Sequence, residues 1–142
     1  MRTAVVAAMA FLCLSVAALA QSVIPALPKE MIGIWGFEAD ACEDDDSSGR
    51  LTVEAKRVAS FASLFKLNEI KQQPDGTIRA AATRFDEGEQ RRPRANLELN
   101  LLSPDKLSVK SDRNEPITYS RCKSPTGKTG QLPFRSDFQT AT

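Results

Sequence analysis

The chain is 142 residues long, and its 19 lysine and arginine residues nearly balance 18 acidic residues, which leaves a formal net charge of +1. A nucleic-acid-binding protein would carry a basic excess or a basic face, and the composition gives no such excess. Histidine is absent, which removes the commonest general base, the commonest metal ligand and the usual pH switch.

The first twenty residues have the pattern of an export signal. A basic residue, Arg2, is followed by an almost wholly apolar stretch at 3–19, and Ala-Leu-Ala at 18–20 supplies the small residues at which signal peptidase cuts. We expect cleavage before Gln21 and a periplasmic or secreted product. A retained anchor is the alternative, but about seventeen apolar residues lie at the bottom of the range that spans a bilayer. We therefore expect no stable membrane span after cleavage.

The cysteines support this interpretation. Cys13 leaves with the signal, so the mature chain keeps Cys42 and Cys122. In an exported protein an isolated pair is typical of one disulfide. On the chain-entropy model, closing a loop of about eighty residues contributes ~4.5 kcal/mol. Two free thiols or a redox pair are the alternatives, and the wide separation argues against the short spacing of a redox site.

From residue 21 onward, short apolar segments alternate with turn residues. Residues 21–32 predict an extended lead-in with one helical turn at 28–31. Period-2 alternation then predicts short strands separated by glycine, proline and aspartate turns. The expected strands are residues 33–37, 50–54, 58–70 (as two strands or one long bent strand), 77–85, 97–101, 107–109 and 117–121. Residues 123–142 predict a disordered tail.

Seven to eight short strands at this spacing predict an all-β domain at 33–122, a small antiparallel barrel or sandwich. Cys42 follows the first strand and Cys122 ends the last. One disulfide would therefore hold the terminal strands together, as barrel closure requires, although a sandwich can also bring its terminal strands close. We expect the interior to be filled by the leucines together with Phe61, Phe65 and Phe85.

Three features carry a family resemblance. The first strand opens with Gly33-x-Trp35 after a helical turn, residues 87–89 read Glu-Gly-Glu, and residues 119–122 read Tyr-Ser-Arg-Cys. The opening resembles that of lipocalin-type barrels and of the small secreted barrels of bacterial protease inhibitors, and the wider layout resembles small exported proteins of α-proteobacteria of unknown function. The resemblance implies a lipocalin-like barrel in which Arg121 packs across Trp35 through a cation–π contact. An ordinary core anchor is the other interpretation of Trp35.

One acidic segment has part of the pattern of a calcium loop. Asp44, Asp46 and Ser48 occupy positions one, three and five, and Gly49 occupies position six. The bidentate glutamate expected at position twelve is replaced by Ala55. A solvated acidic turn is therefore the alternative, and calcium is the only cofactor that the sequence suggests.

A basic cluster, Arg91, Arg92 and Arg94, follows an acidic loop. It could bind an anionic envelope polymer or a partner's carboxylates, or it could be a solvated loop. With no histidine to activate a serine, and no pattern that pairs two carboxylates in an apolar pocket, we expect no catalytic activity.

These observations predict a non-catalytic exported interaction module that binds or inhibits an envelope or extracellular protein. The alternative is a carrier of a small apolar ligand in the mouth of the barrel. Nucleic acid is not among the expected partners.

Overall fold

The computed structural model describes residues 21–38, 40–112 and 114–123, and in this part of the chain it has nine strands, two short 3-10 helices and no α-helix. The strands are β1 (Ser22–Ile24), β2 (Gly33–Gly36), β3 (Arg50–Glu54), β4 (Arg57–Ser60), β5 (Ser63–Gln72), β6 (Ile78–Asp86), β7 (Arg94–Ser103), β8 (Lys106–Ser111) and β9 (Ile117–Arg121). The short helices are η1 (Lys29–Met31) and η2 (Asp40–Cys42). The all-β prediction is therefore confirmed. The predicted signal and nearly all of the predicted tail lie outside the described residues.

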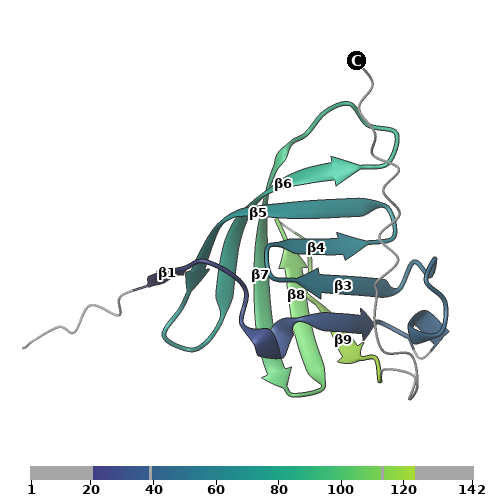
Figure 1. The fold of residues 1–142 in the computed structure, drawn as a ribbon, viewed down its shortest axis with the longest axis horizontal. Coiled ribbons are helices and arrows are strands. Elements are labelled where there is room, and N and C mark those ends of the chain that lie inside the picture. The colour runs from purple at the N-terminus through teal and green to yellow at the C-terminus, as the bar shows by residue number, and fades with distance from the viewer. Residues whose placement is uncertain (1–20, 39, 113, 124–142) are drawn as a thin grey trace, which may run out of the picture.

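Strands β2 to β9 form one antiparallel meander, and the last strand pairs with the first to close an eight-stranded barrel. Trp35 is opposite Arg121 across this seam. Figure 1 shows β7 and β8 crossing behind β3 and β4, as in a strongly coiled sheet. The structure thus selects the barrel over the sandwich. No helix of the described residues is long and apolar enough to cross a bilayer.

Strand β1 lies outside the closed ring, where the sequence predicted only an extended lead-in. It pairs with residues 70–72 of β5, on the same edge that pairs with β4 through residues 64–66. Between these two segments, β5 has a bulge at Leu67–Glu69. The bulge shifts the alternation, so Leu67 and Ile70 both face the core although they are three residues apart.

The interior of the barrel is packed with apolar side chains from β2 to β8 and from the lead-in. They are Leu27, Met31, Trp35, Leu51, Val53, Val58, Phe65, Leu67, Ile70, Ile78, Ala80, Ala82, Ala95, Leu97, Leu99, Leu107 and Val109. Of the three phenylalanines expected inside, Phe65 is buried, but Phe61 lies in the β4–β5 turn with 59% of its surface exposed. Phe85 is opposite Leu64 on the outer face, because Ala82 faces inward and side chains alternate along β6. The expectation was wrong for these two residues.

The barrel has two different ends, since successive turns of a meander lie at opposite ends. At the end that we call the capped end lie the β3–β4, β5–β6 and β7–β8 turns, and the lead-in runs across it (Figure 1). There Leu27 donates its N–H to the carbonyl of Ala55 at 2.8 Å, and Leu27 and Met31 are only 4% and 3% exposed. The opposite end, which we call the loop end, carries the β2–β3 loop (37–49), the β4–β5 turn (61–62), the β6–β7 loop (87–93) and the β8–β9 connection.

Candidate functional site

The tryptophan of the first barrel strand anchors the capped end. Trp35 is fully buried, and its indole N–H donates to the carbonyl of Met31 at 3.0 Å. The guanidinium carbon of Arg121 lies 4.1 Å from the Trp35 ring centroid, which is cation–π geometry. The structure therefore brings together the two residues that the family resemblance paired.

The same arginine connects the lead-in to the β7–β8 turn. Its Nε donates to the carbonyl of Pro104 at 2.9 Å and its Nη1 to that of Ile32 at 3.1 Å, while Nη2 donates to the carbonyl of Glu30. Gly33 has a φ of +145°, and a Cβ at this position would lie 3.0 Å from Arg121 Nη1. Glycine adopts this φ without strain and leaves room for the guanidinium, so the Gly-x-Trp sequence and Arg121 form one structural unit.

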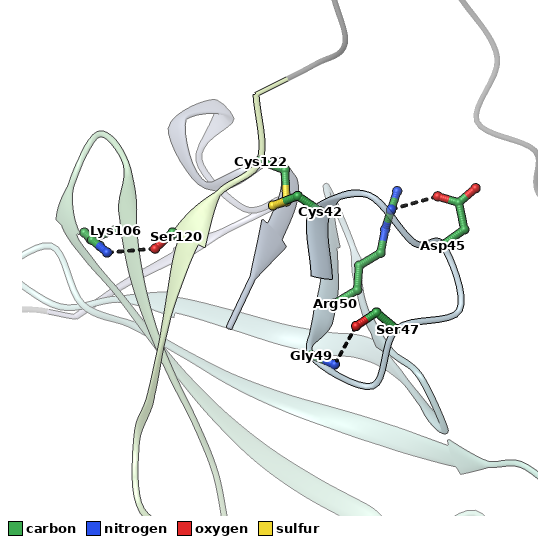
Figure 2. Close-up of a disulfide and its surroundings, with 8 residues drawn as sticks. All are labelled: Cys42, Asp45, Ser47, Gly49, Arg50, Lys106, Ser120 and Cys122. Atoms are coloured by element: carbon green, nitrogen blue, oxygen red, sulfur yellow. Dashed lines mark hydrogen bonds and ion pairs between the residues drawn. A yellow bond between two sulfur atoms is a disulfide. The ribbon is translucent and has the colours of Figure 1, made fainter. Parts of the chain in front are cut away.

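A disulfide joins the β2–β3 loop to the barrel seam. Cys42, at the end of η2, bonds to Cys122 directly after β9, and the predicted bridge is present (Figure 2). A Cβ on Gly36 would lie 2.9 Å from the Cys42 sulfur, so this glycine allows the loop to approach β2. Ala41 packs beside it with no exposed surface. The bridge fixes the start of an acidic loop against the barrel wall.

The residues of the predicted calcium loop make local turn contacts. Asp44 Oδ1 accepts the N–H of Asp46 at 2.9 Å. The Ser47 hydroxyl accepts the N–H of Gly49 at 3.3 Å, as Figure 2 shows. Ser48 is exposed. Among residues 21–38, 40–112 and 114–123, no group of three or more carboxylates or cysteines is placed to hold a metal ion. Calcium binding stays a prediction, which a comparison of the melting temperature with and without calcium would test.

At the loop end, inward-facing positions of β5 and β6 carry polar side chains. The Ser63 hydroxyl donates to Asp86 Oδ1 at 2.5 Å, and Arg84 Nε donates to Asp86 Oδ2 at 2.8 Å. The hydrogen bond from Ser63 lowers the pKa of Asp86, and the bond and charge of Arg84 add to it, against an opposing effect of desolvation. Asp86 therefore acts as a carboxylate that links the start of β5 to the end of β6 at the loop end.

The opposite side of the loop end is apolar. Tyr119 packs against the core, and burial raises the pKa of its phenol. Phe37 meets Tyr119 edge to face, with ring centroids 6.3 Å apart. Ile117 is opposite the core residue Val109, yet it is 43% exposed, and Phe37 is 56% exposed. Apolar surface on the core side of the barrel thus reaches solvent at this end.

An open groove of about 570 Å³ lies on the outer face of β3 and β4, among the connections of the loop end. Its floor is the cross-strand pair Thr52 and Ala59 of β3 and β4. One wall is the β2–β3 loop at 45–47, and the other is formed by Phe61 with Glu87. The second wall is held in place by a hydrogen bond from the N–H of Glu87 to the carbonyl of Ala62 at 3.1 Å.

The predicted basic cluster lies at the β6–β7 loop and the start of β7. The Arg92 guanidinium carbon is 4.7 Å from the centroid of the Phe85 ring, while Arg91 and Arg94 are exposed. In the described part of the chain, none of the three forms an ion pair with a carboxylate. Arg92 thus covers an outward-facing aromatic ring. The exposure of Arg91 and Arg94 does not by itself indicate a ligand.

Comparison with known proteins identified no relative. Neither a scan against protein-family models nor searches of curated proteins and of solved structures gave a match. The functional argument therefore depends on this chain's own geometry.

Sequence reasoning missed the groove at the loop end. Asp46, Phe61 and Glu87 come from three separate connections, and no local pattern indicates that they meet. One signal was present: Phe61 follows Ser60 and precedes Ala62 and Ser63, a run of small residues that is typical of a tight turn rather than a core segment.

Proposed function

We propose that this protein is a non-catalytic binding module that recognises another protein through the loop end of its barrel. The main support is the distribution of exposed apolar side chains. Of the five large ones in the described residues, Phe37, Phe61 and Ile117 lie at the loop end, and Val23 and Leu102 lie elsewhere. Exposed apolar side chains on or beside charged loops at one end of a barrel are typical of interaction surfaces.

The acidic β2–β3 loop adds charge to this surface. Between Phe37 and Gly49 the sequence has six carboxylates and no basic residue; they are Glu38, Asp40, Glu43, Asp44, Asp45 and Asp46. Charged loops around an apolar centre steer a partner of opposite charge and favour one orientation. We therefore expect the partner's contact surface to be basic and partly apolar.

The proposed location is the periplasm or the extracellular medium. The Cys42–Cys122 disulfide suits an oxidising compartment, and the first twenty residues have the pattern of an export signal. We also retain the lipocalin-like relationship as a proposal, which the Arg121 contact with Trp35 supports. Inhibition of the bound partner would be one outcome of such recognition.

Site-specific photo-crosslinking in envelope extract tests the proposal. A photoreactive phenylalanine analogue at Phe61 should yield a discrete protein adduct, whereas the same analogue at Leu102, which is 55% exposed at the capped end, should not. Equal labelling from both positions, or no adduct above background from Phe61, would overturn the proposal.

A second candidate function has one specific observation in its favour. Phe37, Ile117 and Tyr119 bring apolar surface from the core side of the barrel to the loop end, and a small apolar ligand could bind there. A fluorescent fatty acid should then bind the wild type and lose affinity in Ile117→Asn. No binding, or equal binding by the variant, would count against a carrier.

A further inference from the structure

The groove beside the acidic loop has the chemistry to bind a cationic side chain. It is lined by three carboxylates, those of Asp45, Asp46 and Glu87, against one guanidinium, that of Arg50. Arg50 is engaged already, because its Nη1 lies 2.7 Å from Asp45 Oδ1 and its side chain is only 16% exposed (Figure 2). The structure gives Asp46 and Glu87 no cationic partner among the described residues.

An aromatic ring stands beside these carboxylates. Phe61 forms one wall of the groove with Glu87, and 59% of its surface is in contact with solvent. A face of an aromatic ring attracts an ammonium or guanidinium group. A ring this exposed removes little apolar surface from water, so Phe61 contributes little to folding and its ring remains accessible to a bound cationic group.

The shape of the groove favours an extended polypeptide over a single ion. Its two walls come from different loops and leave an open channel over the outer faces of β3 and β4, and its volume of about 570 Å³ exceeds the needs of one cation. The described residues also offer no metal-holding group there. A peptide segment could place a basic side chain against Phe61 while its backbone follows the channel.

We propose that this groove binds a lysine- or arginine-containing extended segment of the partner protein. A basic side chain lies against the Phe61 ring, and Asp46 and Glu87 neutralise its charge from opposite walls. The inference rests on the proposed function, since it names the chemistry of the partner that the loop end recognises. Charge complementarity and the exposed ring select this occupant.

The test is the affinity of the full chain for a fluorescein-labelled octapeptide of alternating arginine and alanine, measured by anisotropy at low salt. Phe61→Ala should weaken binding about fivefold, through loss of the cation–π contact. Asp46→Asn combined with Glu87→Gln should weaken it about tenfold and reduce its salt dependence. An octapeptide of alternating glutamate and alanine should not bind.

Two control variants show whether the losses are specific to the groove. Leu102→Ala removes a similarly exposed apolar side chain outside the groove lining, and Glu115→Gln removes an exposed carboxylate outside it. Both should bind the octapeptide like the wild type. Absence of binding by the wild type, or equal losses in the groove and control variants, would overturn the inference.

The tail supplies one rival occupant, because it follows Lys123 and contains Lys128 and Arg135. If Lys128→Gln with Arg135→Gln raised the affinity for the octapeptide, the chain's own tail would occupy the groove and the inference would fail. Crosslinking distinguishes a failure of the groove inference from a failure of the proposed function. A partner adduct at Phe61 without octapeptide binding would overturn only the groove chemistry. Octapeptide binding without an adduct would overturn the proposed function and leave standing only the groove's preference for basic segments.

Discussion

The two ends of the barrel differ in what their side chains contact. At the capped end, Trp35 and Met31 are almost completely buried, and Arg121 donates to carbonyls of two separate segments. At the loop end, Phe37 and Phe61 are more than half exposed. The difference indicates that the capped end supplies more of the stability, and it leaves at the loop end the exposed apolar and charged groups on which the proposed recognition depends.

The disulfide connects these two regions and should have the largest single effect. Replacing Cys42 and Cys122 together by serine removes a crosslink across a sequence separation of 80 residues. On the chain-entropy model, we expect the free energy of unfolding to fall by about 4.5 kcal/mol, as measured by guanidinium denaturation of the double variant and the oxidised wild type. Unchanged stability would show that the seam of β2 and β9 does not need the crosslink.

Truncation of the capped end's anchor should cost nearly as much. Trp35→Ala removes a fully buried indole and its hydrogen bond to Met31, so we expect a loss of about 4 kcal/mol. Phe61→Ala at the loop end is the matched control, with an expected change within about 0.5 kcal/mol because its ring is mostly exposed. Equal losses in the two variants would contradict the division of roles between the ends.

The arginine that closes the capped end should have an intermediate effect. Arg121→Met keeps an apolar contact with Trp35 but removes the donors to Pro104, Ile32 and Glu30, and we expect a loss of about 2 kcal/mol. Arg92→Met removes a cation–π contact with Phe85 at the loop end and should cost about 0.5 kcal/mol. Thermal unfolding of both variants would measure the difference, and a larger effect of Arg92→Met would contradict it.

The sequence was sufficient for the fold class because most strands carry their own evidence. Leu97, Leu99 and Leu101 alternate with polar residues, and proline, aspartate and glycine at 74–76 mark the β5–β6 turn. In the structure that turn has Gly76 at a φ of +87°, a conformation in which glycine is unstrained. Local patterns of this kind predict strands because the alternation of apolar and polar residues determines which face of each strand is buried.

The features that the sequence did not predict depend on contacts between distant segments. Strand β1 has three residues, too few to show alternation, and its pairing with β5 depends on the bulge at Leu67–Glu69. The groove depends on how the barrel brings three connections together, so the small residues around Phe61 could indicate its turn but not the carboxylates that it meets there. The pairing of Trp35 with Arg121 was expected only from the family resemblance, and the groove at the loop end was not expected at all.

The smallest expected effect is a pH dependence that compares one carboxylate at each end. Asp86 at the loop end and Asp75 in the β5–β6 turn both have a pKa below the ordinary 3.8, the first chiefly through the hydrogen bond from Ser63 and the second through the N–H of Thr77. A carboxyl group whose pKa is lowered by folding stabilises the protein above its unfolded pKa. That contribution is lost as the pH falls through the folded value.

Wild type should therefore be more stable than Asp86→Asn near neutral pH, and the difference should shrink once the pH falls below about 3.8. Asp75→Asn should behave in the same way, since its carboxylate also accepts hydrogen bonds in the ionised form. Denaturant unfolding at a series of pH values from neutral to acidic would measure both differences. A gap between wild type and Asp86→Asn that widened on acidification would mean that the protonated form of Asp86 is favoured in the folded protein, contrary to its contacts with Ser63 and Arg84.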